Sequence, residues 1–195
     1  LLVGKSKQQV EIAIPQEQEV TVTNSDIPGW KRYTSKRYAV WYSIDVPKEW
    51  EGDFWGYKEN NFDGGYDDFY PRGAALYSRI RIQPPEKLKD YYSHAGLHYE
   101  SEDLKPLEKL GENYKNEFDR SFTYSEINGY TMFIEKSIGK ESSTLLYNFL
   151  SSKHIYIHIK SKDLLFQIGS TGWETSKNNI EEPLFDKIIS TLRIL

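Results

Sequence analysis

Residues 122–134 read FTYSEINGYTMFI, and the centre of this stretch decides which kind of sheet the chain builds. Asn128 and Gly129 both tolerate the positive φ angle that a two-residue type I′ turn needs at its central positions. Aromatic and β-branched residues, which favour strands, flank this dipeptide on both sides. The sequence therefore predicts a tight β-hairpin over 122–134, and with it an antiparallel arrangement of strands.

Alternating hydrophobicity predicts further strands before and after this hairpin. They are 38–46, 75–82, 144–150, 154–160 and 164–170. Proline cannot donate a hydrogen bond to a strand ladder, so Pro47 is expected to end the first of them and Pro84-Pro85 the second. The polar residues 151–153 are expected to form a turn between 144–150 and 154–160.

Helices are predicted in the middle and at the end of the chain. Proline is tolerated in the first turn of a helix, so a short helix is expected to open at Pro85. Leucines recur at helical spacing over 101–116, and apolar residues do so over 181–192. Sequential strands joined by short turns, with helices to cover them, predict a single α+β domain with a mostly antiparallel sheet.

Composition excludes several classes of protein. The chain has 195 residues and a net charge of −4, so it lacks the basic surface of a nucleic-acid-binding protein. It contains no cysteine, which excludes a disulfide framework, a thiolate zinc site and a cysteine nucleophile. No stretch approaches the roughly 20 apolar residues that span a bilayer, and no polybasic run marks a membrane-binding segment.

The first 28 residues are polar and rich in Gln and Glu, and they predict a tether in front of a domain at 29–195. The alternation of Val20 and Val22 also allows a short strand there. The sequence begins at Leu1 rather than at a methionine. This start fits either a fragment boundary or the removal of an upstream export signal or membrane anchor, and the second option predicts an extracytoplasmic protein, secreted or membrane-tethered.

Two segments resemble the PsbP-like family, which belongs to the wider Mog1/PsbP-like fold. The first combines 30–33 (WKRY) with 42–50 (YSIDVPKEW), an aromatic-rich strand that runs into a proline and is followed by a tryptophan. The second, 185–194, is similar to the family's last helix, which ends in a small-Thr-apolar turn and a short apolar strand. The family often has a glycine where this chain has Trp41, so the first motif is partial.

The resemblance, which spans roughly residues 30–195, implies an α/β/α sandwich around a mostly antiparallel, about six-stranded central sheet. It also implies an exported or lumenal protein, often lipid-anchored in bacteria. Plant members are accessory subunits of photosystem II that help to retain calcium and chloride without catalysing a reaction, and none of their ligand residues can be matched here. A shared fold does not by itself assign a function.

The loop 51–73 interleaves acidic and aromatic residues with glycines. Exposed aromatic rings stack on sugars or anchor protein partners. The predicted anchors for a protein or glycan are Trp55, Tyr57, Tyr66 and Tyr70. Calcium prefers several oxygen ligands from a compact loop, which makes Asp63, Asp67 and Asp68 weaker candidates for a metal site. The alternative is an ordered loop whose rings pack on the sheet while its acids stay in solvent.

Two pairs of histidines have spacings that invite a metal-site interpretation. His94 and His98 are four residues apart, as in some helical zinc sites, but Gly96 interrupts the segment, which favours two polar loop histidines. On a strand, His154 and His158 share one face but lie about 13 Å apart, too far for one metal ion. This second pair predicts a polar face that is exposed to solvent or packed against a helix.

The sequence contains no nucleophile elbow, no phosphate-binding loop and no dinucleotide fingerprint. The leading hypothesis is therefore a non-enzymatic extracytoplasmic binding or accessory domain that recognises a protein or glycan through the loop 51–73 and needs no cofactor. The alternatives are a cell-envelope hydrolase that uses carboxylates of the same loop, and a cytosolic adaptor similar to Mog1.

Overall fold

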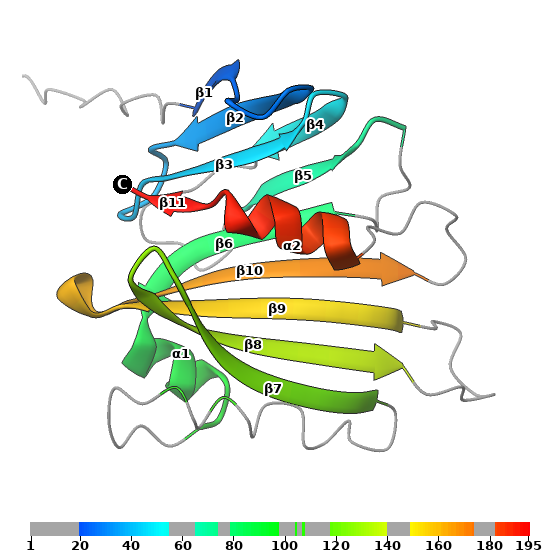
Figure 1. Ribbon diagram of the computed structural model, residues 1–195. Coiled ribbons are helices and arrows are strands. Elements are labelled where there is room, and N and C mark those ends of the chain that lie inside the picture. The colour runs from blue at the N-terminus through cyan, green and yellow to red at the C-terminus, as the bar shows by residue number, and fades with distance from the viewer. Residues whose placement is uncertain are drawn as a thin grey trace, which may run out of the picture.

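The computed structural model describes residues 20–54, 65–73, 79–97, 104, 107, 118–139, 149–173 and 182–195, which form an α+β fold of mostly antiparallel sheet (Figure 1). The strands build two sheets, with the orders β1-β2-β3-β11 and β4-β5-β6-β10-β9-β8-β7. The single sheet of about six strands that the resemblance implied is therefore wrong in its strand number. The reason is that both ends of the described chain pair into a four-stranded sheet of their own.

The four-stranded sheet consists of β1 (Val20–Asn24), β2 (Trp30–Ser35), β3 (Tyr42–Pro47) and β11 (Arg193–Ile194). β1 lies in the segment that was expected to be a tether, and it pairs with β2 along its whole length. Residues 1–19 lie outside the described part of the chain. β11 pairs with β3, so the C-terminal segment lies next to a strand from the start of the domain.

The seven-stranded sheet consists of β4 (Trp50–Phe54), β5 (Asp67–Pro71), β6 (Arg79–Lys87), β7 (Phe118–Ile127), β8 (Tyr130–Gly139), β9 (Phe149–Ile159) and β10 (Leu164–Trp173). The strands β4 to β6 are neighbours in chain order, and so are β7 to β10. The two groups meet where β10 pairs antiparallel with β6. β10 contains the strand predicted at 164–170, which is thereby confirmed.

The predicted hairpin is also confirmed, because β7 and β8 pair antiparallel along their whole length. Asn128 has a φ angle of 49° and Gly129 one of 82°, as the two-residue turn requires. The Asn128 side chain donates a hydrogen bond of 2.6 Å to the backbone oxygen of Leu192. The turn is therefore attached to the C-terminal segment as well as to its own strands.

The prediction that Pro84-Pro85 ends a strand is wrong, because β6 continues to Lys87. Two features of the pairing accommodate the prolines. β5 stops pairing with β6 at Ile82, so beyond that point no donor is needed on that side. On the other side, the register with β10 shifts between Leu165 and Gln167, which places both prolines opposite one residue in a β-bulge.

Three further expectations about strands differ from the structure. The segment 51–73, which was expected to be a loop, contains most of β4 and the whole of β5, and these two strands pair antiparallel. β9 runs without a break through 151–153, which was expected to be a turn, because Ser152 pairs with β8 on one side and with β10 on the other. The strand predicted from residue 38 begins only at Tyr42, although Tyr38 and Val40 are both buried. Burial of alternate residues here results from a loop that lies on the core rather than from a strand.

Two α-helices are described. α1 (Leu88–His94) begins three residues later than expected, and α2 (Glu182–Ser190) confirms the closing helix. The helix expected over 101–116 lies almost entirely outside the described residues, although Leu104 and Leu107 are described and buried. A short 3-10 helix, η3 (Lys160–Lys162), connects β9 to β10.

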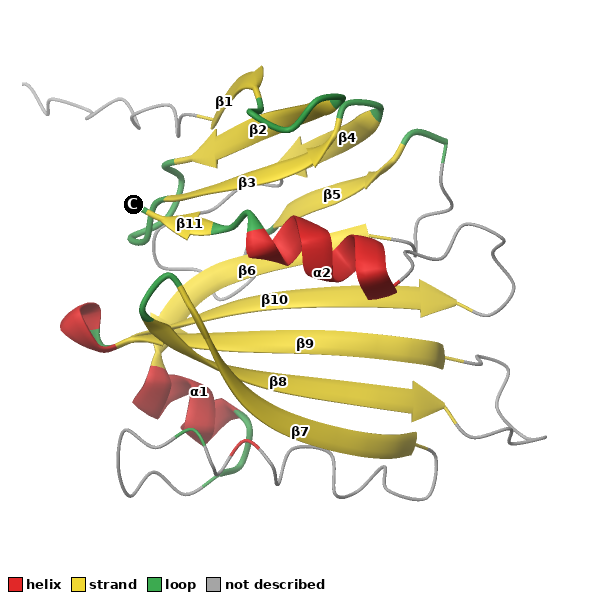
Figure 2. Ribbon diagram, viewed as in Figure 1, coloured by secondary structure: helices red, strands yellow, loops and turns green. Residues whose placement is uncertain are grey.

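The seven-stranded sheet is covered on both faces (Figure 2). The four-stranded sheet and α2 pack on one face and share a single hydrophobic core with it, to which Tyr42, Phe69 and Phe185 contribute. On the other face, α1 packs together with Leu104 and Leu107 in a smaller core. The sequence placed helices over the sheet correctly, but a second sheet provides much of one covering layer.

A buried carboxylate joins the two sheets. Asp67, at the start of β5, is fully buried. It accepts hydrogen bonds of 3.0 Å from the hydroxyls of Ser35 and Tyr38, and further ones from Arg37 and Tyr42. Burial, and then the charge of Asp67, raise the pKa of Tyr42 well above its ordinary value, so the phenol stays protonated and donates. All four donors come from the end of β2, the start of β3 and the loop between them.

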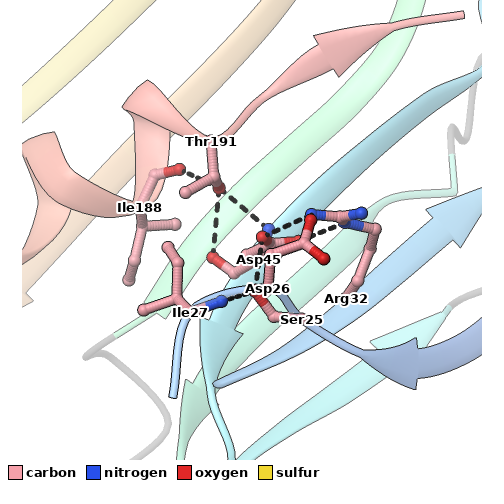
Figure 3. Close-up of polar contacts among 7 residues, drawn as sticks. All are labelled: Ser25, Asp26, Ile27, Arg32, Asp45, Ile188 and Thr191. Atoms are coloured by element: carbon pink, nitrogen blue, oxygen red, sulfur yellow. Dashed lines mark hydrogen bonds and ion pairs between the residues drawn. The ribbon is translucent and has the colours of Figure 1, made fainter. Parts of the chain in front are cut away.

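Asp45, whose side chain is also buried, links the two segments that carry the family resemblance through its backbone (Figure 3). Asp45 in β3 accepts hydrogen bonds of 2.7 and 2.9 Å from the Arg32 guanidinium and one of 2.6 Å from the Ser25 hydroxyl. Its backbone N–H donates to the Thr191 hydroxyl at 2.9 Å, and this hydroxyl donates to the backbone oxygen of Ile188 at 2.6 Å. Thr191 thus holds the end of α2 against β3.

Asp67→Asn is expected to lower the free energy of unfolding by about 3 kcal/mol, because it removes the charge that pairs with Arg37 in a site without solvent. Asp186→Asn is the matched control, since its ion pair with Lys153 lies at the surface and its side chain is 51 % exposed. The control is expected to change stability by less than about 1 kcal/mol. Urea unfolding measures both changes, and equal losses would show that Asp67 does not join the sheets.

The ionised Asp45 side chain is expected to stabilise the fold less as the pH becomes acidic. Burial by itself favours the neutral acid, but hydrogen bonds from Arg32 and Ser25 hold the pKa of Asp45 below its ordinary value. Because the unfolded chain takes up the proton more readily, this stabilisation is complete above the ordinary carboxyl pKa of about 4 and is lost as pH falls through the lower pKa of the folded state. In Asp45→Asn, unfolding free energies measured along a pH series should decline less steeply below about pH 4 than in the wild type.

Candidate functional site

A row of mostly charged residues crosses the seven-stranded sheet on the face that carries α1. Its members are direct cross-strand partners, one from each of six neighbouring strands. In strand order they are Asp53, Asp68, Arg81, Gly169, His154 and Glu135, called the polar row below. Directly opposed residues in a sheet place their side chains on the same face, so the register alone aligns these groups.

One half of the polar row is centred on an arginine. Arg81 donates from Nε and Nη2 to the two oxygens of Asp68, at 2.9 and 3.0 Å, and Arg79 donates to the same carboxylate at 2.7 Å. The side chain of Asp68 is 2 % exposed and that of Arg81 is 31 % exposed. The hydrogen bonds that Arg81 donates to Asp68 raise the pKa of Arg81. Two-point binding of a planar guanidinium fixes its orientation as well as its charge.

Tyr66 lies directly on this arginine. The Arg81 Cζ atom is 3.6 Å from the centre of the Tyr66 ring, which is a close cation–π contact. Tyr66, Asp68 and Tyr70 are spaced two residues apart and therefore belong to the same face of the sheet. Burial, and then the charges of Asp53 and Glu51, raise the pKa of Tyr70, so its hydroxyl stays protonated at neutral pH.

The other half of the polar row contains a histidine over a glycine. A Cβ atom added to Gly169 would lie 2.7 Å from Cδ2 of His154, so the imidazole occupies the space that a side chain would need. Next to it, Glu135 is buried, with its Oε2 atom 3.9 Å from His154 Nδ1 and 3.4 Å from the Tyr156 hydroxyl. Glycine in the middle of this strand therefore leaves room for the His154 ring over Gly169, beside Glu135.

The structure describes half of the predicted anchor residues. Tyr66 and Tyr70 are half-buried on the α1-bearing face, whereas Trp55 and Tyr57 lie outside the described residues. The roles of Trp55 and Tyr57 as anchors stay predictions. Tyr66 packs on Arg81 of the sheet, as the alternative expected of the rings, and it keeps part of its surface exposed. The same alternative expected the acids to stay in solvent, which is wrong for Asp67 and Asp68, because both are buried.

The three candidate metal ligands do not come together in the described residues. Asp67 and Asp68 are adjacent in β5, so their side chains point to opposite faces of the sheet, one toward Arg37 and the other toward Arg81. Asp63 lies outside the described part. Among the described residues, no group of three or more His, Asp or Glu side chains could hold a metal ion. Calcium binding by the loop stays a prediction.

The first histidine pair differs from the expectation of two loop residues, because His94 belongs to α1. α1 ends at His94, whose Nδ1 lies 3.2 Å from Glu86 Oε2, and His98 lies outside the described residues. His154 and His158 share the α1-bearing face of β9, but His154 is partly exposed whereas the side chain of His158 is 1 % exposed. One of these two therefore faces solvent, and the other is packed under the layer that contains α1.

Sequence reasoning missed the cationic part of the site. Arg79 and Arg81 alternate with Ile80 and Ile82, and this pattern could have placed both arginines on the face opposite the buried isoleucines. The pairing of Arg81 with Asp68 had no such signal. It depends on the register between β5 and β6, which are separated by residues outside the described part.

Comparison of the chain with protein-family models, with curated proteins and with solved structures finds no match. Within the described residues, neither α1 nor α2 has the length and apolar character needed to cross a membrane. A functional assignment therefore has to come from the chemistry of the residues themselves.

Gly169→Ala tests the geometry at the centre of the polar row. Alone, it is expected to lower the free energy of unfolding by about 1 kcal/mol, because the His154 ring must leave its place. In a His154→Ala background the same change should be neutral or slightly stabilising, since alanine loses less backbone entropy than glycine. Urea unfolding of the four proteins gives the coupling energy. A coupling near zero would mean that the ring does not lie over Gly169.

Proposed function

We propose that this chain is a non-enzymatic, extracytoplasmic binding or accessory domain of PsbP-like fold that recognises a protein or glycan through β5 and the loop before it. The observation that carries the proposal is the stack of Tyr66 on Arg81, which is itself held by the buried Asp68. An aromatic ring held in this way is a typical anchor for a partner.

The physical advantage of this arrangement is preorganisation. A tyrosine presents a large apolar surface and a polar tip, and it suits both sugar rings and protein side chains. Binding normally costs free energy to immobilise each flexible interface side chain, on the order of 1 kcal/mol. Tyr66 is already restrained by the guanidinium beneath it. More of the contact energy is therefore available for affinity.

The PsbP-like part of the proposal is supported by the packing of the two segments that resemble this family, 30–50 and 185–194. β11 pairs with β3, and Thr191 bonds to the backbone of Asp45. The residues that carry the resemblance are thus the residues that close the four-stranded sheet. The extracytoplasmic location is supported by the resemblance itself.

Binding is preferred to hydrolysis because of what the described carboxylates do. A glycosidase needs two carboxyl groups that converge on one bond, with one of them available as a proton donor. Asp67 and Asp68 lie on opposite faces of the sheet, and both are paired with arginines. Their arrangement serves packing and the orientation of Arg81 rather than proton transfer.

The proposal is tested with Tyr66→Ala and Tyr70→Ala on glycan arrays and in affinity capture of partner proteins. Tyr66→Ala is expected to weaken binding by at least about tenfold, as is usual for a central aromatic anchor. Arg81→Lys should give an intermediate loss, because lysine keeps the charge but not the planar surface under the ring. Tyr124→Ala is the matched control, since Tyr124 is 45 % exposed on β7, at the far edge of the same sheet.

If both tyrosine variants retain every interaction that the wild type shows, β5 is not the contact surface. If the wild type instead turns over a cell-envelope polymer and Asp68→Asn abolishes that turnover, the chain is an enzyme. Thermal unfolding of each variant separates a lost contact from a lost fold.

A further inference from the structure

Two exposed apolar side chains lie next to each other at one end of the four-stranded sheet. Trp41 is 48 % exposed and Leu195 is 56 % exposed. The backbone N–H of Leu195 donates a hydrogen bond of 2.9 Å to the backbone oxygen of Trp41, which fixes the two residues side by side. The neighbouring residues of Trp41 in the sequence, Val40 and Tyr42, are buried, so the indole is turned outward by the packing of its neighbours.

Lysines from two distant parts of the sequence surround this apolar pair. Lys36 Nζ lies 5.1 Å from the centre of the Trp41 ring. Lys162 Nζ donates a hydrogen bond of 3.1 Å to the backbone oxygen of Ala39, and Lys160 belongs to the same short helix η3. Figure 2 shows the β2–β3 loop, the end of β11 and η3 at one end of the molecule. These five residues, Lys36, Trp41, Lys160, Lys162 and Leu195, are called the lysine–tryptophan end.

Exposed lysines gather at this end, although the chain as a whole is acidic. All three lysines are exposed, whereas the chain carries a net charge of −4. An acid at the end of η3, Asp163, lies 3.6 Å from the buried ring of His158. Exposed ammonium groups thus lie at the same end of the molecule as the exposed apolar pair.

We propose that the lysine–tryptophan end docks on the surface of a bilayer that contains anionic lipids. Tryptophan favours the boundary between headgroups and acyl chains, because its ring is apolar and its N–H is polar. Lysine extends its aliphatic stem along such a surface and keeps its ammonium group among the phosphates. A cluster of cations next to an exposed Trp–Leu pair combines both contributions.

A lipid surface fits these residues better than an acidic protein does. All three cations are lysines, whose compact charge on a flexible stem suits a fluid array of phosphates. A specific protein partner is more often recognised by arginines that bind carboxylates at two points. The arginines of the β2–β3 region, Arg32 and Arg37, are instead paired with Asp45 and Asp67. None of the residues of the lysine–tryptophan end takes part in the contact between Tyr66 and Arg81, so the inference does not depend on the proposed function.

Co-sedimentation of the full chain with vesicles tests the inference. The wild type is expected to bind phosphatidylcholine vesicles that contain about 30 % phosphatidylglycerol and to bind vesicles of phosphatidylcholine alone much more weakly. Binding should fall steeply as salt is raised, because the lysines are exposed and their charges are screened. The triple variant Lys36→Gln, Lys160→Gln, Lys162→Gln is expected to bind on the order of 100-fold weaker, and Trp41→Ala roughly tenfold weaker. Thermal unfolding of the triple variant checks that the change at position 162, which bonds the β2–β3 loop through Lys162 Nζ, leaves the fold intact.

Tyr124→Ala and Lys89→Gln are the matched controls, because they remove an exposed aromatic ring and an exposed lysine elsewhere on the surface. Both should bind anionic vesicles like the wild type. The proposal is overturned if vesicles of both compositions bind equally, if neither binds, or if the triple variant and Trp41→Ala bind normally. Retention on immobilised polyglutamate without vesicle binding would likewise overturn it and would point to an acidic protein as the partner.

Discussion

The pair Asp67-Asp68 at the start of β5 is the constraint on which both faces of the seven-stranded sheet depend. A strand turns successive side chains to opposite faces, so one carboxylate enters the space between the two sheets and the other lies on the α1-bearing face. Asp67 accepts hydrogen bonds from the β2–β3 region, and Asp68 accepts them from Arg79 and Arg81, whose orientation it fixes. Both carboxylates are almost completely buried, where unpaired charge is costly, so both sets of partners must be in place in the folded chain.

The consequences of Asp67 reach the surface of the molecule. Because Tyr38 and Tyr42 both donate to Asp67, the chain between them is held against the core without forming a strand. Val40 is buried with them, and Trp41 is turned outward. The same inter-sheet contact that stabilises the fold therefore places an exposed indole beside Lys36 and Leu195. On the other face, Asp68 acts in the same way, since it orients Arg81 under Tyr66.

The closure of the four-stranded sheet is a second constraint, and it links the two ends of the described chain. β11 has only two residues, too few to be stable through pairing alone. It is held by its neighbours: Asn128 bonds to Leu192, and Thr191 bonds to the backbone of Asp45. Contacts between residues so far apart in sequence carry a large loop-closure entropy, so the short β11 depends on these additional bonds.

Local chemistry determined those parts of the structure that the sequence predicts well. The Asn128-Gly129 turn, the strand within 164–170 and the closing helix follow from backbone preferences and from side-chain periodicity, which need no distant partner. The polar segment 151–153 was assigned to a turn, but pairing with β8 and β10 on both sides makes it part of a strand. Pro84-Pro85 was assigned to a strand end, but a β-bulge in the pairing with β10 lets the strand continue. Tertiary structure alone decided which charges meet. Asp67 with Arg37, Asp68 with Arg81, and Lys162 with the β2–β3 loop depend on register and packing between segments that are neighbours only after folding.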